Sequence, residues 1–174
     1  MTRGRANPRH WTLPARLKRA RQAAGLTALV LSQAARVGKS LVSILEGGGG
    51  RVPRIHTTEQ LARALGVSPA WLAFGIELPY EPTTELRSKG FAASLSEARR
   101  ERGLSMRAVD KRAGISPGST RSLEAGTMPS LDTLELISKA LGVSPAWLAF
   151  GEGPREDPRR RWPRLGPLTV QGGE

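Results

Sequence analysis

The side chains best suited to chemistry in this sequence are hydrogen-bond donors that lie between Leu104 and Gly126. Residues 116–122 of that stretch (SPGSTRS) hold four hydroxyl groups and one guanidinium, that of Arg121. A guanidinium presents its N–H groups as a planar fork, which suits paired acceptors better than single ones. The whole chain has 27 lysines and arginines against 15 acidic residues, a net charge of +12. This charge indicates a polyanionic partner, most commonly nucleic acid.

The residue types that catalysis and metal binding need are missing or scattered. The chain has no cysteine, which excludes disulfides, thiolate chemistry and cysteine–zinc sites. His10 and His56 are its two histidines, and neither has the spacing of a metal ligand. The run Gly47–Gly50 lacks the Lys-Ser/Thr that follows the glycines of a phosphate-binding loop. Since no Ser/His/Asp or Cys/His set occurs either, the sequence predicts a protein that is not an enzyme and has no metal or cofactor.

The hydropathy pattern gives no sign of a membrane protein. No apolar run approaches the roughly 20 residues that span a bilayer, and no signal-peptide core follows the N-terminus. We therefore expect a soluble, cytoplasmic protein with no membrane partner.

The stretch from Leu104 to Gly126 has the pattern of two short helices joined by a tight turn. Ser105 is a good N-cap for the first helix, and Gly114 can adopt the left-handed conformation that the turn requires. Ser116 is expected to cap the second helix, with Pro117 at its first position, where a missing N–H costs nothing.

An internal repeat organises the rest of the chain. The segment LGVSPAWLAFG at residues 65–75 recurs unchanged at 141–151, which is 76 positions later. Glu46 corresponds to Glu124 at a spacing of 78, so the first copy has two extra residues in its glycine-rich loop. The sequence predicts an all-α protein with two tandem five-helix domains and disordered basic ends. The expected divisions are a basic arm (1–13), domain 1 (14–75), a linker (76–90), domain 2 (91–151) and an Arg/Pro-rich tail (152–174).

The helix-turn-helix spacing, the LGVSPAWLAFG ending and a repeated Arg/Glu pair resemble the Xre/Cro family, the phage-repressor-like (lambda-repressor-like) DNA-binding domains. In that family the second helix of the motif lies in the major groove of DNA. The family also pairs an arginine late in its first helix with a glutamate at the end of its third. The resemblance therefore implies structural salt bridges between Arg21 and Glu46 and between Arg99 and Glu124.

The resemblance implies a DNA-binding surface in domain 2. Arg121 is the side chain expected to contact guanine, because a bidentate guanidinium–guanine pair gives about 1–3 kcal/mol of discrimination. Asp110 occupies a position where the family usually has alanine, so we expect an altered helix crossing or a contact with a neighbouring Arg or Lys. The implied DNA-binding residues are Ser105, Arg107, Lys111, Ser116, Pro117, Gly118, Ser119, Arg121, Ser122, Thr127 and Ser130.

Domain 1 departs from the pattern of domain 2. Arg36 stands at the turn position of Gly114, and Gly38 replaces the serine expected to cap the second helix. Apolar residues fall on the face that should meet DNA, and such clusters usually mark a protein interface. We therefore expect a protein interface at Leu29, Val30, Leu41 and Ile44, with weaker contacts to the DNA backbone from Lys39, Ser40, Arg51 and Arg54.

Together these features predict a sequence-specific, double-stranded-DNA-binding transcriptional regulator, acting as a repressor in a bacterial or phage cytoplasm at the nucleoid. Domain 2 would be the main DNA reader, and domain 1 a pairing surface or a second DNA contact. The chain would accordingly form a homodimer or an intramolecular pseudo-dimer, and no small-molecule ligand is expected. The alternative is a protein-interaction module, an antitoxin or an adaptor on a mobile element, that uses the helix-turn-helix face of domain 1.

Overall fold

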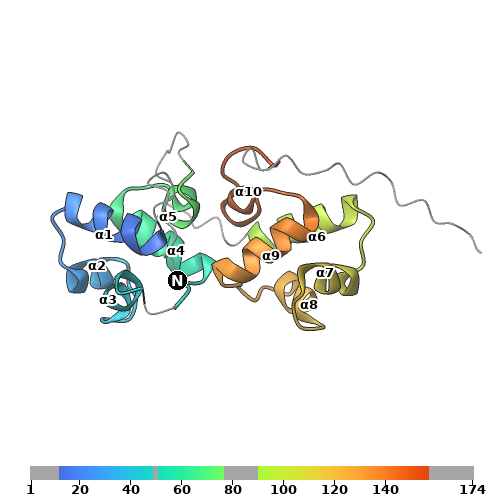
Figure 1. Cartoon of the computed structure of the whole chain (residues 1–174), viewed down its shortest axis with the longest axis horizontal. Coiled ribbons are helices and arrows are strands. Elements are labelled where there is room, and N and C mark those ends of the chain that lie inside the picture. Colours follow the sequence, from blue (N-terminus) through green and yellow to red (C-terminus); the bar gives the residue numbers. More distant parts are fainter. Residues whose placement is uncertain (1–11, 49–50, 77–89, 157–174) are drawn as a thin grey trace, which may run out of the picture.

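The computed structural model describes residues 12–48, 51–76 and 90–156. These residues form ten α-helices and no β-strand, five helices in each domain (Figure 1), which confirms the all-α prediction. The expectations for the arm at 1–11, Gly49 and Gly50, the linker at 77–89 and the tail beyond 156 lie outside the described residues. The helices are α1 (Leu13–Ala23), α2 (Ala28–Ala34), α3 (Leu41–Glu46), α4 (Ile55–Leu65), α5 (Pro69–Phe74), α6 (Phe91–Glu101), α7 (Met106–Ala113), α8 (Ser119–Glu124), α9 (Leu131–Leu141) and α10 (Pro145–Phe150).

Local sequence signals account for many of the helix ends. Ser105 accepts a hydrogen bond from the Ala108 N–H and so caps α7, as expected. Ser68 and Ser144 cap α5 and α10 in the same way, and each is followed by a proline at the first helical position. Ser116 is not a cap: α8 begins at Ser119, and its N-cap residue is Gly118 with φ +85°. The prediction for Ser116 and Pro117 was therefore wrong, and both residues belong to the turn between the two helices.

Two apolar clusters hold the fold together, and one of them crosses between the domains. The first lies within domain 1 and includes Leu17, Leu31 and Leu61. The second fills domain 2 and also takes in Ile55 and Phe74 from domain 1. Burial of apolar area is the main favourable term in packing, so the two domains share part of their core.

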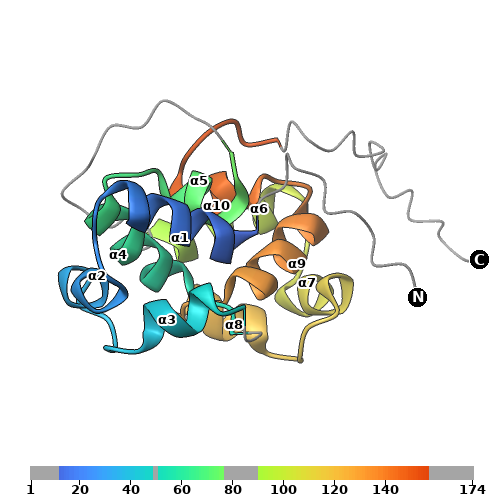
Figure 2. The ribbon, with the colours of Figure 1, turned by 60° about the vertical axis from the view of Figure 1, so that its left-hand side comes forward.

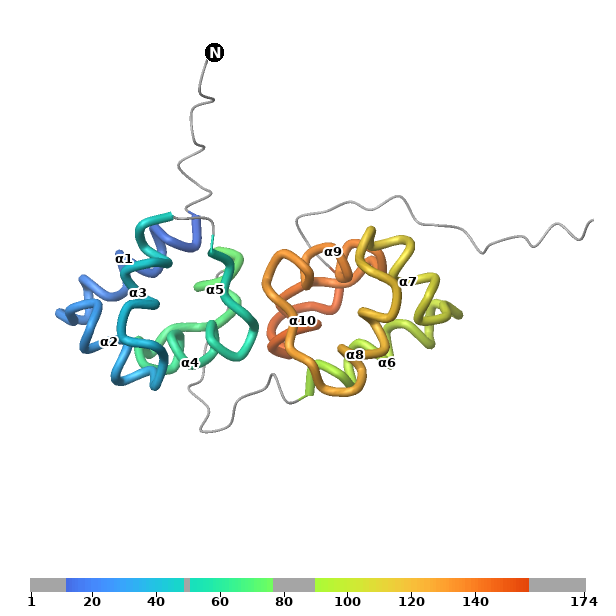
Figure 3. Tube along the Cα trace, turned by 90° about the horizontal axis from the view of Figure 1, so that it is seen from below, coloured from blue at the N-terminus to red at the C-terminus, as the bar shows by residue number. Residues whose placement is uncertain are grey.

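The domains pair through equivalent segments. The Ile55 N–H donates to the Pro129 carbonyl (3.2 Å), and the Leu131 N–H donates to the Pro53 carbonyl (3.1 Å). The two bonds are equivalent, because Ile55 corresponds to Leu131 and Pro53 to Pro129 at the repeat spacing of 76. They flank an isolated antiparallel bridge between Arg54 and Ser130. The rings of Phe74 and Phe150, which are also equivalent, lie 6.3 Å apart between centroids. Such reciprocal contacts are those of an approximate two-fold axis, and Figure 3 shows the corresponding helices of the two domains placed on opposite sides of the molecule.

The first residues of the predicted tail pack against both domains, which corrects the expectation of disorder at this point. The Glu152 carboxylate accepts hydrogen bonds from the Ser68 hydroxyl (2.6 Å) and the Ala70 N–H (3.2 Å) of domain 1. Arg155 pairs with Glu101 of α6, and its guanidinium lies 4.6 Å from the centre of the Trp147 ring. Residues 152–156 therefore join α10 to α6 and to the start of α5.

Candidate nucleic-acid interface

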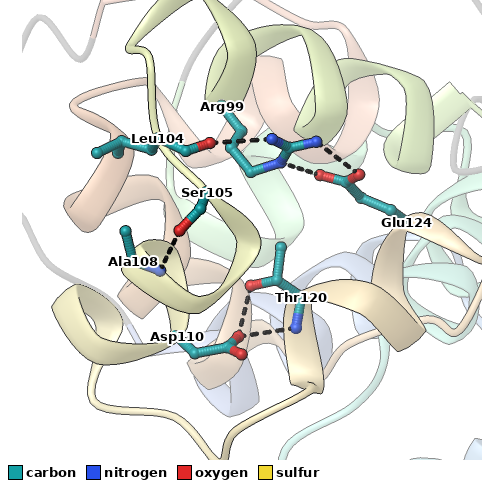
Figure 4. A network of polar contacts seen from close by, with 7 residues as sticks. All are labelled: Arg99, Leu104, Ser105, Ala108, Asp110, Thr120 and Glu124. Carbon is teal, nitrogen blue, oxygen red and sulfur yellow. Dashed lines mark hydrogen bonds and ion pairs between the residues drawn. The ribbon is translucent and has the colours of Figure 1, made fainter.

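An arginine–glutamate clamp in each domain fixes the second helix of the motif to the first helix of the domain. Arg99 donates from Nε and Nη2 to the two carboxylate oxygens of Glu124 at 2.6 and 3.0 Å, and from Nη1 to the Leu104 carbonyl at 2.9 Å (Figure 4). Arg21 and Glu46 form the same pair at 2.6 and 2.8 Å. The side chains are only 10–15% exposed. The hydrogen bonds to the carboxylates raise the pKa of both arginines, against the lowering effect of burial.

Asp110 holds the start of α8 in place. One carboxylate oxygen accepts from the Thr120 N–H (2.8 Å) and the Thr120 hydroxyl (2.6 Å), and the other accepts from the Gly118 N–H (2.8 Å) (Figure 4 shows the Thr120 bonds). Burial would raise the pKa of Asp110, but the bonds from Thr120 and Gly118 outweigh it, so the pKa lies below the ordinary value. Among the described residues the acid pairs with no arginine or lysine, so that part of the expectation was wrong. It supplies from α7 the capping acceptor that Ser116 was expected to provide.

The described residues of domain 1 form no counterpart of this network. At the repeat spacing of 78, Asp110 corresponds to Ser32 and Thr120 to Val42. Ser32 is fully buried, and its hydroxyl has no hydrogen-bond partner among the described residues. Ser40, at the N-cap position of α3, makes no side-chain capping bond. The start of α3 is therefore held by apolar packing where that of α8 is held by polar bonds.

Most of the expected DNA-binding side chains of domain 2 are exposed around α8. Arg121 is exposed, and its guanidinium makes no hydrogen bond or ion pair within the described residues. Ser119 is half-buried, and Ser130 is half-buried with its hydroxyl engaged in capping α9. Thr120 and Leu123 are buried beneath the helix. The remaining predicted residues, Ser105, Arg107, Lys111, Ser116, Pro117, Gly118, Ser122 and Thr127, are exposed.

A groove of about 570 Å³ runs between α8 and the junction of the two domains. Arg54 of domain 1 lines it together with Ser119, Ser122 and Ser130 of domain 2. Arg54 is exposed, and its backbone forms the bridge with Ser130 at the pseudo-two-fold axis. A cation from one domain is thus added to the polar face of the other.

The corresponding face of domain 1 has three exposed apolar side chains. Leu29 is 49% exposed, Val30 44% and Ile44 37%. Leu41 is half-buried and packs against the domain 1 core, so it is less accessible than the other three residues of the predicted interface, which stays a prediction. Arg36 adopts the left-handed conformation with φ +54°, as its place in the turn required. The four domain 1 residues expected to contact the DNA backbone, Lys39, Ser40, Arg51 and Arg54, are exposed.

The two motifs present their second helices on one side of the molecule. Helices α3 and α8 both lie at the lower edge in Figures 1 and 2, one in each half of the molecule, and both face the viewer in Figure 3. A half-turn about the pseudo-two-fold axis exchanges them, because the contacts at that axis are reciprocal. One chain therefore carries the pair of helices that a symmetric dimer would carry on two.

Sequence reasoning missed three features of this surface. It did not place Arg54 beside α8, assign Asp110 to the helix start, or dock Glu152 and Arg155. Asp110 carried a usable signal, since a carboxylate ten residues before Thr120 replaces a small residue. The other contacts cross between domains or return over α6, and no local pattern marks them.

The described residues contain no group of three potential metal ligands among His, Cys, Asp and Glu. No helix in the described part of the chain is long and apolar enough to cross a membrane.

Comparisons with known proteins agree with this geometry. A helix-turn-helix family model matches residues 95–148, and a second model, of a helix-turn-helix domain, matches residues 13–73. Over 73 residues the chain is 37% identical to the HTH-type transcriptional regulator PrtR of Pseudomonas aeruginosa. That match covers 42% of this chain and 28% of PrtR, so the likeness extends over less than a third of that relative.

Proposed function

Because this chain belongs to the helix-turn-helix family, with one such domain in each half, we propose that it binds double-stranded DNA and regulates transcription as a repressor. The observation that carries the proposal is the exposure of α3 and α8 on one side of an internally paired chain (Figure 3). In helix-turn-helix proteins these helices enter successive major grooves. Repression then follows from occupation of an operator that other proteins need.

A single chain supplies both DNA-binding units. The segments that pair α5 with α10 and Pro53 with Leu131 are used within the chain, so no second copy is needed to create a two-fold arrangement. We therefore favour the intramolecular pseudo-dimer over a homodimer. Dimeric helix-turn-helix proteins bind half-sites one helical turn apart, about 10 bp centre to centre, and we expect that spacing for the two domains of one chain.

Domain 2 is the main reader in this proposal. Its exposed Arg121 guanidinium suits the O6 and N7 acceptors of guanine in the major groove. Arg107 and Lys111 on α7 suit the phosphates beside that groove. Domain 1 contributes phosphate contacts through Lys39, Arg51 and Arg54. Such contacts add affinity that does not depend on sequence.

A mobility-shift titration on duplex DNA tests the proposal. The full chain should shift random duplex at low salt and a selected operator at ~150 mM salt, where a protein-only adaptor shows little binding. Arg121→Ala should weaken operator binding by about 5- to 150-fold, the range for one bidentate base contact. Arg100→Ala, which removes an exposed arginine of α6 instead, serves as the control and should leave operator discrimination unchanged. A binding ratio of two chains per operator would reject the pseudo-dimer, and no shift at any salt would reject DNA binding.

The exposed apolar side chains of domain 1 favour a second candidate, a protein-interaction module of the antitoxin or adaptor type. Leu29 and Val30 are nearly half exposed on α2, and exposed apolar groups of this kind often mark a site where another protein binds. Sedimentation of the wild type and of a Leu29→Glu, Val30→Glu double variant separates the two. A self-associating wild type whose mass falls to one chain in the variant would support this candidate.

A further inference from the structure

The two second helices of the motifs can be aligned residue by residue through the pseudo-two-fold axis. The clamp glutamates Glu46 and Glu124 are equivalent, since each accepts the same forked bond from its arginine. In that alignment Val42 is equivalent to Thr120 and Leu45 to Leu123, and all four residues are buried. Ser43 then corresponds to Arg121, and Ile44 corresponds to Ser122. The buried positions agree, so the exposed positions are properly paired as well.

At the exposed positions the two helices offer different chemistry to a duplex. Arg121 has two parallel donors, which match guanine and no other base in the major groove. Ser43 has one short hydroxyl, which donates or accepts and so does not discriminate between bases. Ile44 is 37% exposed and has no polar atom in its side chain. The apolar feature of the major groove is the thymine C5-methyl group.

The domains also differ in charge. Domain 1, residues 14–75, has nine basic and two acidic residues, whereas domain 2, residues 91–151, has eight basic and six acidic ones. Excess cations strengthen attraction to phosphates regardless of base sequence. The described residues of domain 1 also lack the hydrogen bonds that hold the start of α8, because Ser32 and Val42 stand at the positions of Asp110 and Thr120. Helix α3 is thus less firmly oriented for contacts with bases, and domain 1 has more cations for contacts with the DNA backbone.

Building on the proposed function, we infer that one chain recognises an asymmetric operator. Domain 2 specifies a guanine through Arg121 in one half-site. The other half-site, under domain 1, requires no guanine at the position related by the two-fold axis, and it favours thymine next to Ile44. The approximate symmetry of the protein is therefore not matched by a palindrome in the DNA.

Selection of binding sites from a randomised duplex library by the full wild-type chain is the first test. We expect a guanine in one half-site and none at the symmetric position of the other. Ser43→Arg should then create a guanine preference of about 5- to 150-fold at that symmetric position, so that the selected site approaches a palindrome. Gln22→Arg, which adds the same charge to an exposed position of α1, is the matched control and should change no base preference.

Two further variants keep the inference open to refutation if Ser43→Arg folds poorly. Arg121→Ser should abolish the guanine preference of the first half-site, and Ile44→Ser should abolish the thymine preference of the second. A wild-type site with guanine in both halves would overturn the inference while leaving DNA binding intact. An Ile44→Ser variant that keeps its base preferences but sediments differently would assign Ile44 to a protein interface, which also overturns the thymine contact. Failure of the wild type to bind any duplex would instead refute the proposed function.

Discussion

Replacement of Asp110 by alanine should destabilise the protein far more than the equivalent change in domain 1. Asp110 is 4% exposed and accepts three hydrogen bonds of 2.6–2.8 Å at the start of α8. Its removal leaves the buried Thr120 hydroxyl and N–H without their acceptor. A buried polar group left unpaired costs about 1–3 kcal/mol, and loss of a helix cap typically costs about 1 kcal/mol. We therefore expect Asp110→Ala to lower the free energy of unfolding by about 2–4 kcal/mol.

The matched control is Ser32→Ala in domain 1. The Ser32 hydroxyl is buried and has no partner among the described residues, so its removal deletes an unpaired polar group and no hydrogen bond. Its effect on the free energy of unfolding should be close to zero or slightly favourable. The assay is urea or thermal unfolding followed by circular dichroism. At the size of this chain, a loss of 2 kcal/mol corresponds to a fall in Tm of about 4–8 °C.

Equal effects of the two substitutions would refute this reasoning, because they would show that the bonds to Gly118 and Thr120 contribute nothing beyond what packing supplies. A reciprocal variant strengthens the test. Ser32→Asp combined with Val42→Thr places the same donor and acceptor types in domain 1, and it should recover part of the stability if the backbone there permits the same geometry.

Three further predictions follow from the clamp, the buried acid and the domain junction. The folded-state pKa of Asp110 lies below the ordinary value, so its contribution to the free energy of unfolding is present above the unfolded pKa of about 3.9 and is lost as the pH falls through the folded pKa. Asp110→Asn should therefore lack this pH-dependent part of the stability in acid unfolding, and identical acid unfolding curves for the variant and the wild type would contradict the prediction. Glu124→Ala leaves the Arg99 side chain, which is 11% exposed, without its carboxylate partner. It should lower the free energy of unfolding in urea by about 3 kcal/mol, whereas a loss below ~0.5 kcal/mol would mean that the pair behaves as a solvated surface pair. Arg54→Ala should reduce the slope of log affinity against log salt by about one unit without changing base preference, and an unchanged slope would place Arg54 away from the phosphates.

Much of this architecture was readable from the sequence because its signals are local or repeated. The duplication was evident from LGVSPAWLAFG at 65–75 and 141–151, and the capping role of Ser105 followed from its position before a helical pattern. The partners Arg21 with Glu46 and Arg99 with Glu124 came from a family resemblance. Nothing in the chain's own spacing of 25 residues would have singled them out.

Long-range contacts explain where the sequence interpretation failed. Ser116 does not cap α8, because the carboxylate of Asp110 in the preceding helix accepts the hydrogen bonds from the Gly118 and Thr120 N–H groups. Leu41 is half-buried rather than fully exposed, because one side of it packs against the domain 1 core. Such competition between possible partners depends on three-dimensional distances that sequence spacing does not contain.

The amino-acid sequence alone therefore established a duplicated helical protein with a basic character and a polar segment around Arg121. These properties follow from composition, periodicity and repetition, which a linear chain displays directly. The three-dimensional arrangement added the side on which the domains meet and the common direction of α3 and α8 (Figure 3). It did so because the Pro53 and Pro129 carbonyls accept hydrogen bonds from Leu131 and Ile55 of the other domain, and because Phe74 packs against Phe150. Packing and hydrogen bonding act here between residues that are more than 70 positions apart in the chain.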